Sequence, residues 1–294
     1  YKVLFMHGGA TAQFAAVPLN LMTKNGKADY VLSGQFSKKA STEASKYGDV
    51  AIAASSAGAN FSFVPATTRD SFRPDADYVH ICFNNTIFGT KFPYIPDTGD
   101  IPLVADMSSC IASEPIDVSK FGVIYAGAQK NMAPAGLTVV IVDRSLAGRE
   151  LPCTPEIMSY ETMIKHDSLL NTPPCWCIYM LSLQLDWLLE QGGVEAMAER
   201  KARRAAKLYE LLDSSRLYIP RAKEGSRSDM NITFRTPSAA LDAQFVSGAA
   251  ERGLMNLKGH KATGGIRASL YNAMPMEGVD ALARYMREFE KEHT

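Results

Sequence analysis

The sequence predicts an α/β protein: a large, mostly parallel sheet with helices on both faces, followed by a small C-terminal α/β unit. Two observations support this fold. Up to residue 144, short and nearly continuous apolar runs follow one another between glycine turns and helical segments. Strands with this pattern are covered on both faces, as in parallel sheets. From Cys175 onward the apolar residues take up helical spacing, and strands and helices then alternate again.

The first part of the chain supplies the elements of the large sheet. Residues 1–22 indicate a strand, a glycine turn and a helix. Further apolar runs predict a strand at 29–34, a helix at 38–48, a strand at 49–55, a strand with a polar loop at 78–89, and strands at 101–109, 121–130 and 137–144. The strand at 101–109 ends on Asp106, and the strand at 121–130 ends on Lys130.

The second part predicts a compact unit of its own. Its elements are helices at 175–193 and 194–215, a strand at 230–236, a helix at 240–253, a strand at 265–274 and a helix at 278–293. The helix at 194–215 carries a charged face that we expect to be solvated. We place a domain boundary at Gly192–Gly193, which gives a large domain of residues 1–192 and a small domain of residues 193–294.

Composition excludes several classes of function. Of the 294 residues, 46% are hydrophobic and 21% are charged, with 31 basic and 31 acidic side chains. A net charge of zero predicts no nucleic-acid partner and no membrane surface, and no apolar run approaches the roughly 20 residues of a membrane span. The five cysteines fit neither a disulfide framework nor a metal site, so we expect a reducing, cytoplasmic location. Because the chain enters a strand at Tyr1, we expect an N-terminal segment to precede it.

Three predicted strand ends carry polar groups, and sites in open α/β sheets form at such ends. The first is the glycine turn "HGGATAQF", where a helix N-terminus can hold a phosphate. The second is Asp106 and the third is Lys130. Each also has a plain structural interpretation: a simple strand-to-helix turn, a carboxylate that caps the next turn, and a solvated strand end.

Together the three features match what pyridoxal 5'-phosphate requires. A lysine binds the cofactor aldehyde, an aspartate pairs with the pyridinium nitrogen, and a helix N-terminus holds the phosphate. The order along the chain is phosphate turn, aspartate, lysine. This combination favours a catalytic interpretation of Lys130.

At this point the chain resembles a known family. Its motifs "GGATAQFAAVPLNL", "NNTIFG", "YAGAQKNMAPAG", "NTPP", "KGHKATGGIR" and "SLYNAMP" are similar to those of phosphoserine aminotransferases, which belong to class V of the fold-type I pyridoxal-phosphate enzymes. The resemblance covers essentially the whole chain, and it implies a family member that begins several dozen residues earlier. It also implies a homodimer with shared active sites.

The resemblance implies the cofactor contacts. Lys130 would be the Schiff-base lysine and Asp106 the partner of the pyridinium nitrogen. The remaining contacts would be Ala10, Thr11 and Gln129 at the phosphate, Thr86 at the phenolic oxygen or phosphate side, Phe36 stacked on the ring, and Asn171 and Thr172 from the other subunit. Phe36 stands where the family usually has tryptophan, and core packing is its alternative role.

The resemblance also implies the substrates. The reaction would be transamination between glutamate and 3-phosphohydroxypyruvate, giving phosphoserine and 2-oxoglutarate in L-serine biosynthesis. Arg267 would bind the substrate carboxylate, because its planar fork matches two oxygens. His260 and Lys261 would bind the substrate phosphate across the dimer. Lys261 replaces an arginine of the family, and Thr11 replaces an arginine of some bacterial members. The alternative interpretation of the segment that carries His260, Lys261 and Arg267 is a solvated basic loop.

Competing hypotheses remain open. Another class V enzyme, such as an alanine–glyoxylate aminotransferase, would share the cofactor site. A dehydrogenase would need an acidic residue at the end of the second strand, where the sequence has serine and glycine. A truncated, non-catalytic paralogue would act as a binding protein only.

Overall fold

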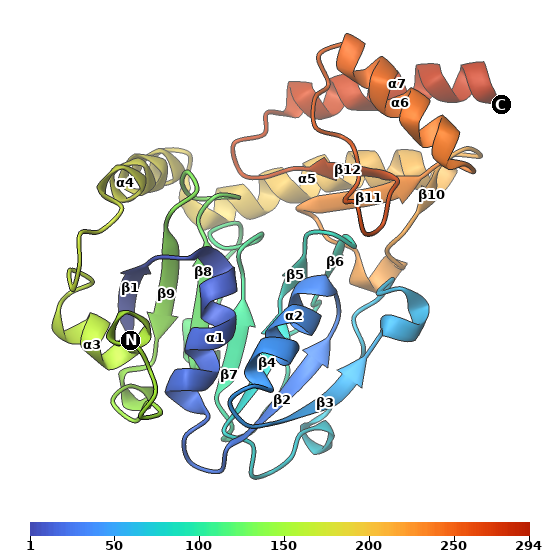
Figure 1. Ribbon diagram of the computed structural model, residues 1–294. Helices are drawn as coiled ribbons and strands as arrows, with labels where there is room; N and C mark the ends of the chain where they lie inside the picture. Colours follow the sequence, from blue (N-terminus) through green and yellow to red (C-terminus); the bar gives the residue numbers. More distant parts are fainter.

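The computed structural model describes all 294 residues as two lobes (Figure 1). The larger lobe is built on a seven-stranded sheet, whose strands in spatial order are β1 (Lys2–Met6), β9 (Thr138–Val142), β8 (Val123–Gly127), β7 (Leu103–Asp106), β4 (Tyr78–Cys82), β2 (Lys27–Leu32) and β3 (Asp49–Ser55). The five strands from β8 to β3 are parallel, and β9 is antiparallel to both β8 and β1. The predicted mostly parallel sheet is therefore confirmed.

Helices cover both faces of this sheet. On one face α1 (Gly9–Leu21) and α2 (Gln35–Ala44) pack with α3 (Tyr160–Lys165) over a core that includes Tyr30, Val104 and Tyr125. On the other face, α4 (Cys175–Glu190) packs through Cys177 against β8 and β9. Loops cover the rest of that face. The central strands β4, β7 and β8 are buried along their whole length, whereas the edge strands β1 and β3 are partly exposed.

The smaller lobe has its own antiparallel sheet of β10 (Ile219–Pro220), β11 (Asn231–Arg235) and β12 (Ile266–Ser269). The helices α5 (Gly193–Ser214), α6 (Ala239–Glu251) and α7 (Met276–His293) pack on it around one hydrophobic cluster. A short hairpin, β5 (Asn84–Asn85) with β6 (Thr90–Lys91), lies between the two lobes. It follows β4 in the sequence, and its residues form hydrogen bonds with β11.

Two sequence-based expectations differ from the structure. The strand that carries Lys130 ends at Gly127, so the lysine lies in the following turn, because the strand's partner β9 pairs no further than Gly127. The expected solvated charged face of α5 is partly wrong: Lys201 and Arg204 are 2% and 3% exposed, since the larger lobe and the 272–276 segment cover them.

No helix in the structure combines the length and the apolar character that crossing a membrane requires.

Candidate active site

The candidate site lies at the carboxyl ends of the parallel strands β4, β7 and β8. Asp106 ends β7, Lys130 follows β8, and Thr86 follows the short hairpin strand after β4. The N-termini of α1 and α2 point to the same end of the sheet, because each helix follows a parallel strand directly. The parallel topology therefore brings together groups that are more than 100 residues apart in sequence.

Lys130 has no carboxylate partner. Its Nζ donates a hydrogen bond of 2.8 Å to the hydroxyl of Thr86, and the same nitrogen lies 5.1 Å from the centroid of the Phe36 ring. Thr86 is buried and Phe36 is half-buried. The predicted neighbours Lys130, Thr86 and Phe36 thus meet, and the amine is held without being neutralised by an ion pair.

One carboxylate oxygen of Asp106 accepts hydrogen bonds from the protein, and the other accepts none. It is 4% exposed, and its Oδ1 accepts hydrogen bonds from the backbone N–H and the hydroxyl of Ser108, at 2.9 and 2.6 Å. The turn-capping interpretation of Asp106 is therefore confirmed, and it uses only Oδ1. Burial raises the pKa of Asp106, and the Lys130 ammonium and the Ser108 bonds oppose that shift. A cationic N–H near Oδ2 would favour the carboxylate.

A buried polar stack lies beside Asp106, and sequence reasoning missed it. Tyr125 pairs with Asp106 in the sheet register, and its hydroxyl is 2.8 Å from Nε2 of His80. The His80 ring stacks on Tyr30 with centroids 4.7 Å apart. Burial lowers the pKa of His80 to about 3, so the ring is neutral at physiological pH. The only signal in the sequence was one histidine inside the apolar run "YVHIC".

The glycine turn before α1 forms an open backbone cradle. Gly8 and Gly9 have φ angles of 87° and 63°, and a Cβ on Gly8 would lie 2.4 Å from Cβ of Ala12. Nothing lies within 4 Å of a Cβ built on Gly9, and the first turn of α1 has no acidic residue and no side-chain cap. The helix N-terminus therefore offers free N–H groups to an anion. Ala10 and Thr11 lie in this first turn.

Two close approaches to glycines shape the turns that lead to Lys130 and to Phe36. The amide of Gln129 lies back over Gly127, so that a Cβ on Gly127 would be 2.7 Å from Oε1. A Cβ on Gly34, just before α2, would lie 2.3 Å from Oδ1 of Asn85. This close approach ties the turn that leads to Phe36 to the residue next to Thr86.

The basic loop of residues 258–267 is compact and has no acidic partner. The N–H of Gly259 donates to the carbonyl of Gly265 at 2.8 Å, and a Cβ on Gly259 would lie 2.0 Å from the Gly264 carbonyl oxygen. Arg267 projects from β12, and its Nε is buried without a hydrogen-bond partner. Neither His260, Lys261 nor Arg267 forms an ion pair. An unpaired basic cluster of this kind suits an anionic substrate.

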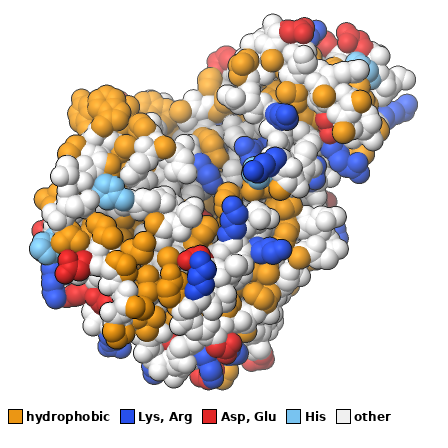
Figure 2. Space-filling view, in the orientation of Figure 1, with side chains coloured by type: hydrophobic (Ala, Val, Ile, Leu, Met, Phe, Trp, Pro, Cys, Tyr) orange, Lys and Arg blue, Asp and Glu red, His pale blue; other side chains and the backbone are white.

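Lys39 joins this cluster from α2 and was not predicted. Burial lowers the pKa of His260, and the positive charges of Arg267, Lys261 and Lys39 lower it further, so these three charges lie within electrostatic range of the His260 ring. Lys39 stands three residues after Phe36, on the same side of α2. Figure 2 shows Lys and Arg side chains gathered where the two lobes meet.

Asn171 and Thr172 are not joined to this site within one chain. Both are exposed in the loop between α3 and α4, and neither forms a hydrogen bond with Lys130, Thr86 or Gln129. Their predicted role across a dimer stays a prediction.

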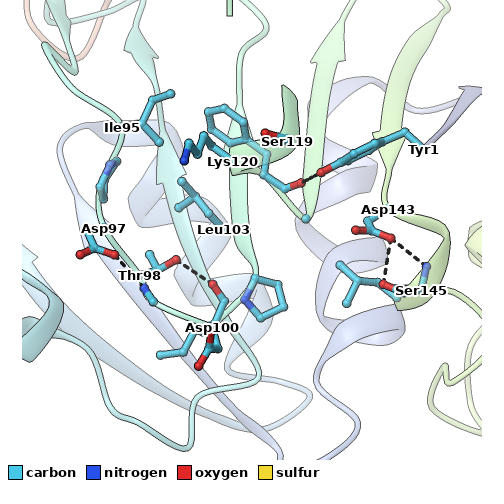
Figure 3. A pocket seen from close by; sticks show the side chains of 17 residues that line it. Tyr1, Ile95, Asp97, Thr98, Asp100, Leu103, Ser119, Lys120, Asp143 and Ser145 are labelled. Atoms are coloured by element: carbon cyan, nitrogen blue, oxygen red, sulfur yellow. Dashed lines mark hydrogen bonds between the residues drawn. The ribbon is translucent and has the colours of Figure 1, made fainter. Parts of the chain in front are cut away.

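A cavity of about 660 Å³ lies at the opposite end of the sheet (Figure 3). It is lined by the starts of β7 and β8 and by Tyr1 and Asp143, and it contains none of the predicted site residues. Its polar groups bond one another: the Tyr1 hydroxyl donates to the Phe121 carbonyl, and the Ser145 hydroxyl donates to Asp143. The chemistry-bearing residues therefore locate the site at the other end.

Comparisons with known proteins identify the family of the chain. The family profile "Aminotransferase class-V" matches residues 1–282. A phosphoserine aminotransferase of Bacillus cereus is 52% identical over 293 residues, which is all of this chain and 81% of that protein.

Solved structures give the same result. The phosphoserine aminotransferase of Bacillus circulans subsp. alkalophilus superimposes with a TM-score of 0.96 at 42% identity, over 100% of this chain and 81% of that one. A pyridoxal-phosphate-bound phosphoserine aminotransferase of Trichomonas vaginalis gives 0.92 at 39% identity, over 97% and 82%. The chain belongs to the class V aminotransferases, within the group of phosphoserine aminotransferases.

Proposed function

We propose that this chain transfers an amino group between glutamate and 3-phosphohydroxypyruvate, giving 2-oxoglutarate and phosphoserine, a step of L-serine biosynthesis. The observation that carries the proposal is the Lys130 amine, held by Thr86 over the Phe36 ring and free of any carboxylate. The relatives named above, which match the whole chain, support the same reaction.

The residues present fit pyridoxal 5'-phosphate, the cofactor of this family. Oδ2 of Asp106 has no hydrogen-bond donor from the protein, so it can accept one from a protonated ring nitrogen. The open cradle at Gly8 and Gly9, with Ala10 and Thr11 in the first helical turn, can hold the phosphate, and we assign Gln129 to it as a further contact. Phe36 can stack on the ring, although over less area than a tryptophan.

The roles of the chain's own groups follow from this arrangement. When bound, the cofactor supplies an electron sink for the substrate carbon. Nζ of Lys130 is the nucleophile that anchors the cofactor aldehyde, and as a free amine it takes the proton from the substrate α-carbon. The Thr86 hydroxyl keeps that nitrogen in place through the 2.8 Å hydrogen bond. The negative charge of the Asp106 carboxylate stabilises a protonated ring nitrogen.

The substrate anions are assigned to the basic loop. Arg267 binds the α-carboxylate, because its fork has no other partner at Nε. His260 and Lys261 bind the phosphate. These assignments explain why a cluster of four basic groups has no acidic residue among its partners.

A homodimer with shared sites is part of the proposal. The helix α4 exposes the large apolar side chains Trp176, Tyr179, Leu183, Leu185 and Leu189. They form the apolar area over α4 at the upper left of Figure 2. An exposed apolar face of this kind indicates an interface. Asn171 and Thr172 lie directly before α4, so an interface there would carry them to the partner's cofactor phosphate.

Two further assignments belong to the proposal. The division into domains at residues 1–192 and 193–294 is supported by the separate hydrophobic cluster of the smaller lobe. A cytoplasmic location is supported by five cysteines, none of which is in a disulfide.

The first test is spectroscopic. Cofactor-loaded protein should show the visible absorbance of a lysine-linked cofactor, and borohydride should fix the label to the peptide that contains Lys130. Lys130→Ala should lose the band, the label and at least about a thousandfold in activity, because it removes both nucleophile and base. Lys120→Ala, a lysine at the opposite end of the sheet, is the matched control and should retain all three.

The second test concerns the substrate. Turnover of 3-phosphohydroxypyruvate should far exceed turnover of glyoxylate, since only the first offers a phosphate to the basic loop. Faster turnover of glyoxylate would identify another class V activity. No turnover of either by protein that carries the lysine-linked band would favour a non-catalytic paralogue.

A further inference from the structure

Another cavity, of about 370 Å³ and lined by basic side chains, lies between α4, α5 and the segment of residues 272–276. Three arginines line it, Arg200, Arg203 and Arg204, together with Trp187 and residues 272–276. Ala273 also lines a smaller cavity that contains Lys130, but no predicted site residue lines this one. The cavity has the size of a small-molecule site.

The arginines of this cavity lack any negative partner. No carboxylate lines the cavity, and none of the three guanidinium groups is in an ion pair. Three cationic side chains therefore converge on one hollow with nothing in the protein to balance them.

Arg204 is the most informative of the three. It is 3% exposed, and its Nη1 donates to the carbonyls of Asn272, at 3.1 Å, and of Met274. Its Nε and Nη2 are buried and have no partner. Burial, and then the charge of Arg200, lower the pKa of Arg204. A buried guanidinium without a counter-charge is costly to fold, so a bound anion would stabilise it.

The other walls of the cavity define its ligand further. Arg200 is held in place by Gln191, which accepts from Nη1 at 2.8 Å, and Arg203 is exposed at the rim. Trp187, Met274, Pro275 and Met276 provide an apolar wall. The cavity thus combines fixed cationic donors with an aromatic surface.

We propose that this cavity binds a small oxyanion, a phosphate or a carboxylate. Arg200 and Arg203 supply the hydrogen bonds, because a guanidinium fork matches two oxygens of such a group. The charge of the anion balances the buried Arg204, and the Trp187 ring covers its side.

Trp187 gives a local readout of binding. The chain has two tryptophans, so Trp176→Phe leaves Trp187 as the only fluorescent indole. In cofactor-loaded protein of this background, inorganic phosphate at constant ionic strength should change the emission in a saturable way. A parallel titration with acetate distinguishes a carboxylate site from a phosphate site, and saturation by either ion supports the proposal.

The variants decide whether the cavity is responsible. Arg203→Gln should raise the phosphate Kd about tenfold, since it removes one charged hydrogen-bond donor, and an exposed position should tolerate the change. Arg284→Gln, an exposed arginine of α7 outside every cavity described above, should leave Kd unchanged. Three results would overturn the proposal: no saturation with either ion, equal effects of Arg203→Gln and Arg284→Gln, or loss of the signal in Lys261→Ala but not in Arg203→Gln.

Discussion

At Asp106 the two oxygens of one carboxylate have separate roles. Oδ1 closes the turn with Ser108, and Oδ2 accepts no hydrogen bond from the protein, which leaves it free for the ring nitrogen in the proposed role. Because burial raises the pKa of Asp106, the folded cofactor-free protein binds this proton more tightly than the unfolded chain does. Its stability therefore falls as the pH rises from the ordinary carboxyl pKa through the raised one.

The substitution Asp106→Asn is therefore expected to change stability and activity differently. Asp106→Asn should leave the cofactor-free protein at pH 7 as stable as the parent or more stable, because the amide keeps Oδ1 and carries no charge. Activity should fall at least about a hundredfold, because a neutral amide does not stabilise a protonated ring nitrogen. Urea unfolding of the cofactor-free protein and steady-state assays check the two parts. A large loss of stability would mean that the carboxylate is mainly structural.

Sequence reasoning found Asp106 and Lys130 because both end apolar runs, where a charged group is conspicuous. It missed Lys39 and His80 for different reasons. Lys39 lies on the exposed side of a helix, where lysine is ordinary, and only the folded chain brings its charge within electrostatic range of His260. His80 depends on strand order, which places it beside Tyr30 and near Tyr125.

At the scale of elements, the loop of residues 258–265 is held by its own backbone. The bond from Gly259 to Gly265 closes it, and only glycine fits at Gly259. Side chains on this loop are therefore presented by a fixed frame, and truncating one of them should not unfold it. The loop allows substrate binding to be tested separately from folding.

Lys261→Ala should raise KM for 3-phosphohydroxypyruvate about tenfold with a small effect on kcat, because one charged contact to the phosphate is lost. Lys258→Ala, in the same loop, is the control and should change neither value. Lys261→Arg should lower KM, since a fork replaces a point charge. Equal KM values for Lys258→Ala and Lys261→Ala would remove Lys261 from the phosphate site.

The types and order of the longer elements were predictable because apolar periodicity reports burial directly, whereas the short elements α3 and β10 were not predicted. The burial of the charged residues Lys201 and Arg204 of α5 was not predictable from the sequence. Helical spacing puts Lys201 and Arg204 on a face of mixed character, and nothing local shows that Glu114 and the 272–276 segment will cover them. Contacts between the lobes are set by the assembled shape, so a local pattern does not reveal them.

At the scale of the whole molecule, four charges join the lobes. Lys91 and Lys201 alternate with Glu114 and Asp229, with distances from 2.5 to 3.4 Å. Burial lowers the pKa of Lys91, but the negative charges of Asp229 and Glu114 have the larger combined effect, so the pKa is raised. The group links the hairpin and a loop of the larger lobe to α5 and the start of β11.

Lys201→Met should destabilise the protein by about 3–5 kcal/mol, because it leaves two partly buried carboxylates with one lysine. Lys207→Met, on the same helix, removes an exposed pair with Asp280 and should cost about 1 kcal/mol or less. Urea unfolding of both variants measures the difference. Equal costs would mean that the four charges contribute no more than a surface pair.

The hydrogen bonds of Asn131, the residue after Lys130, have a wider consequence. Asn131 accepts a hydrogen bond of 2.9 Å from the N–H of Asn272 and donates one of 2.6 Å to the carbonyl of Ile111. The lysine turn is thereby fastened to the segment that leaves β12, the strand of Arg267. In the roles proposed above, this connection keeps the Lys130 amine and the Arg267 guanidinium in a constant relative position. A substrate must then carry its carboxylate directly next to its reacting carbon, as every α-amino acid does, so the choice among amino acids falls to contacts with the rest of the substrate.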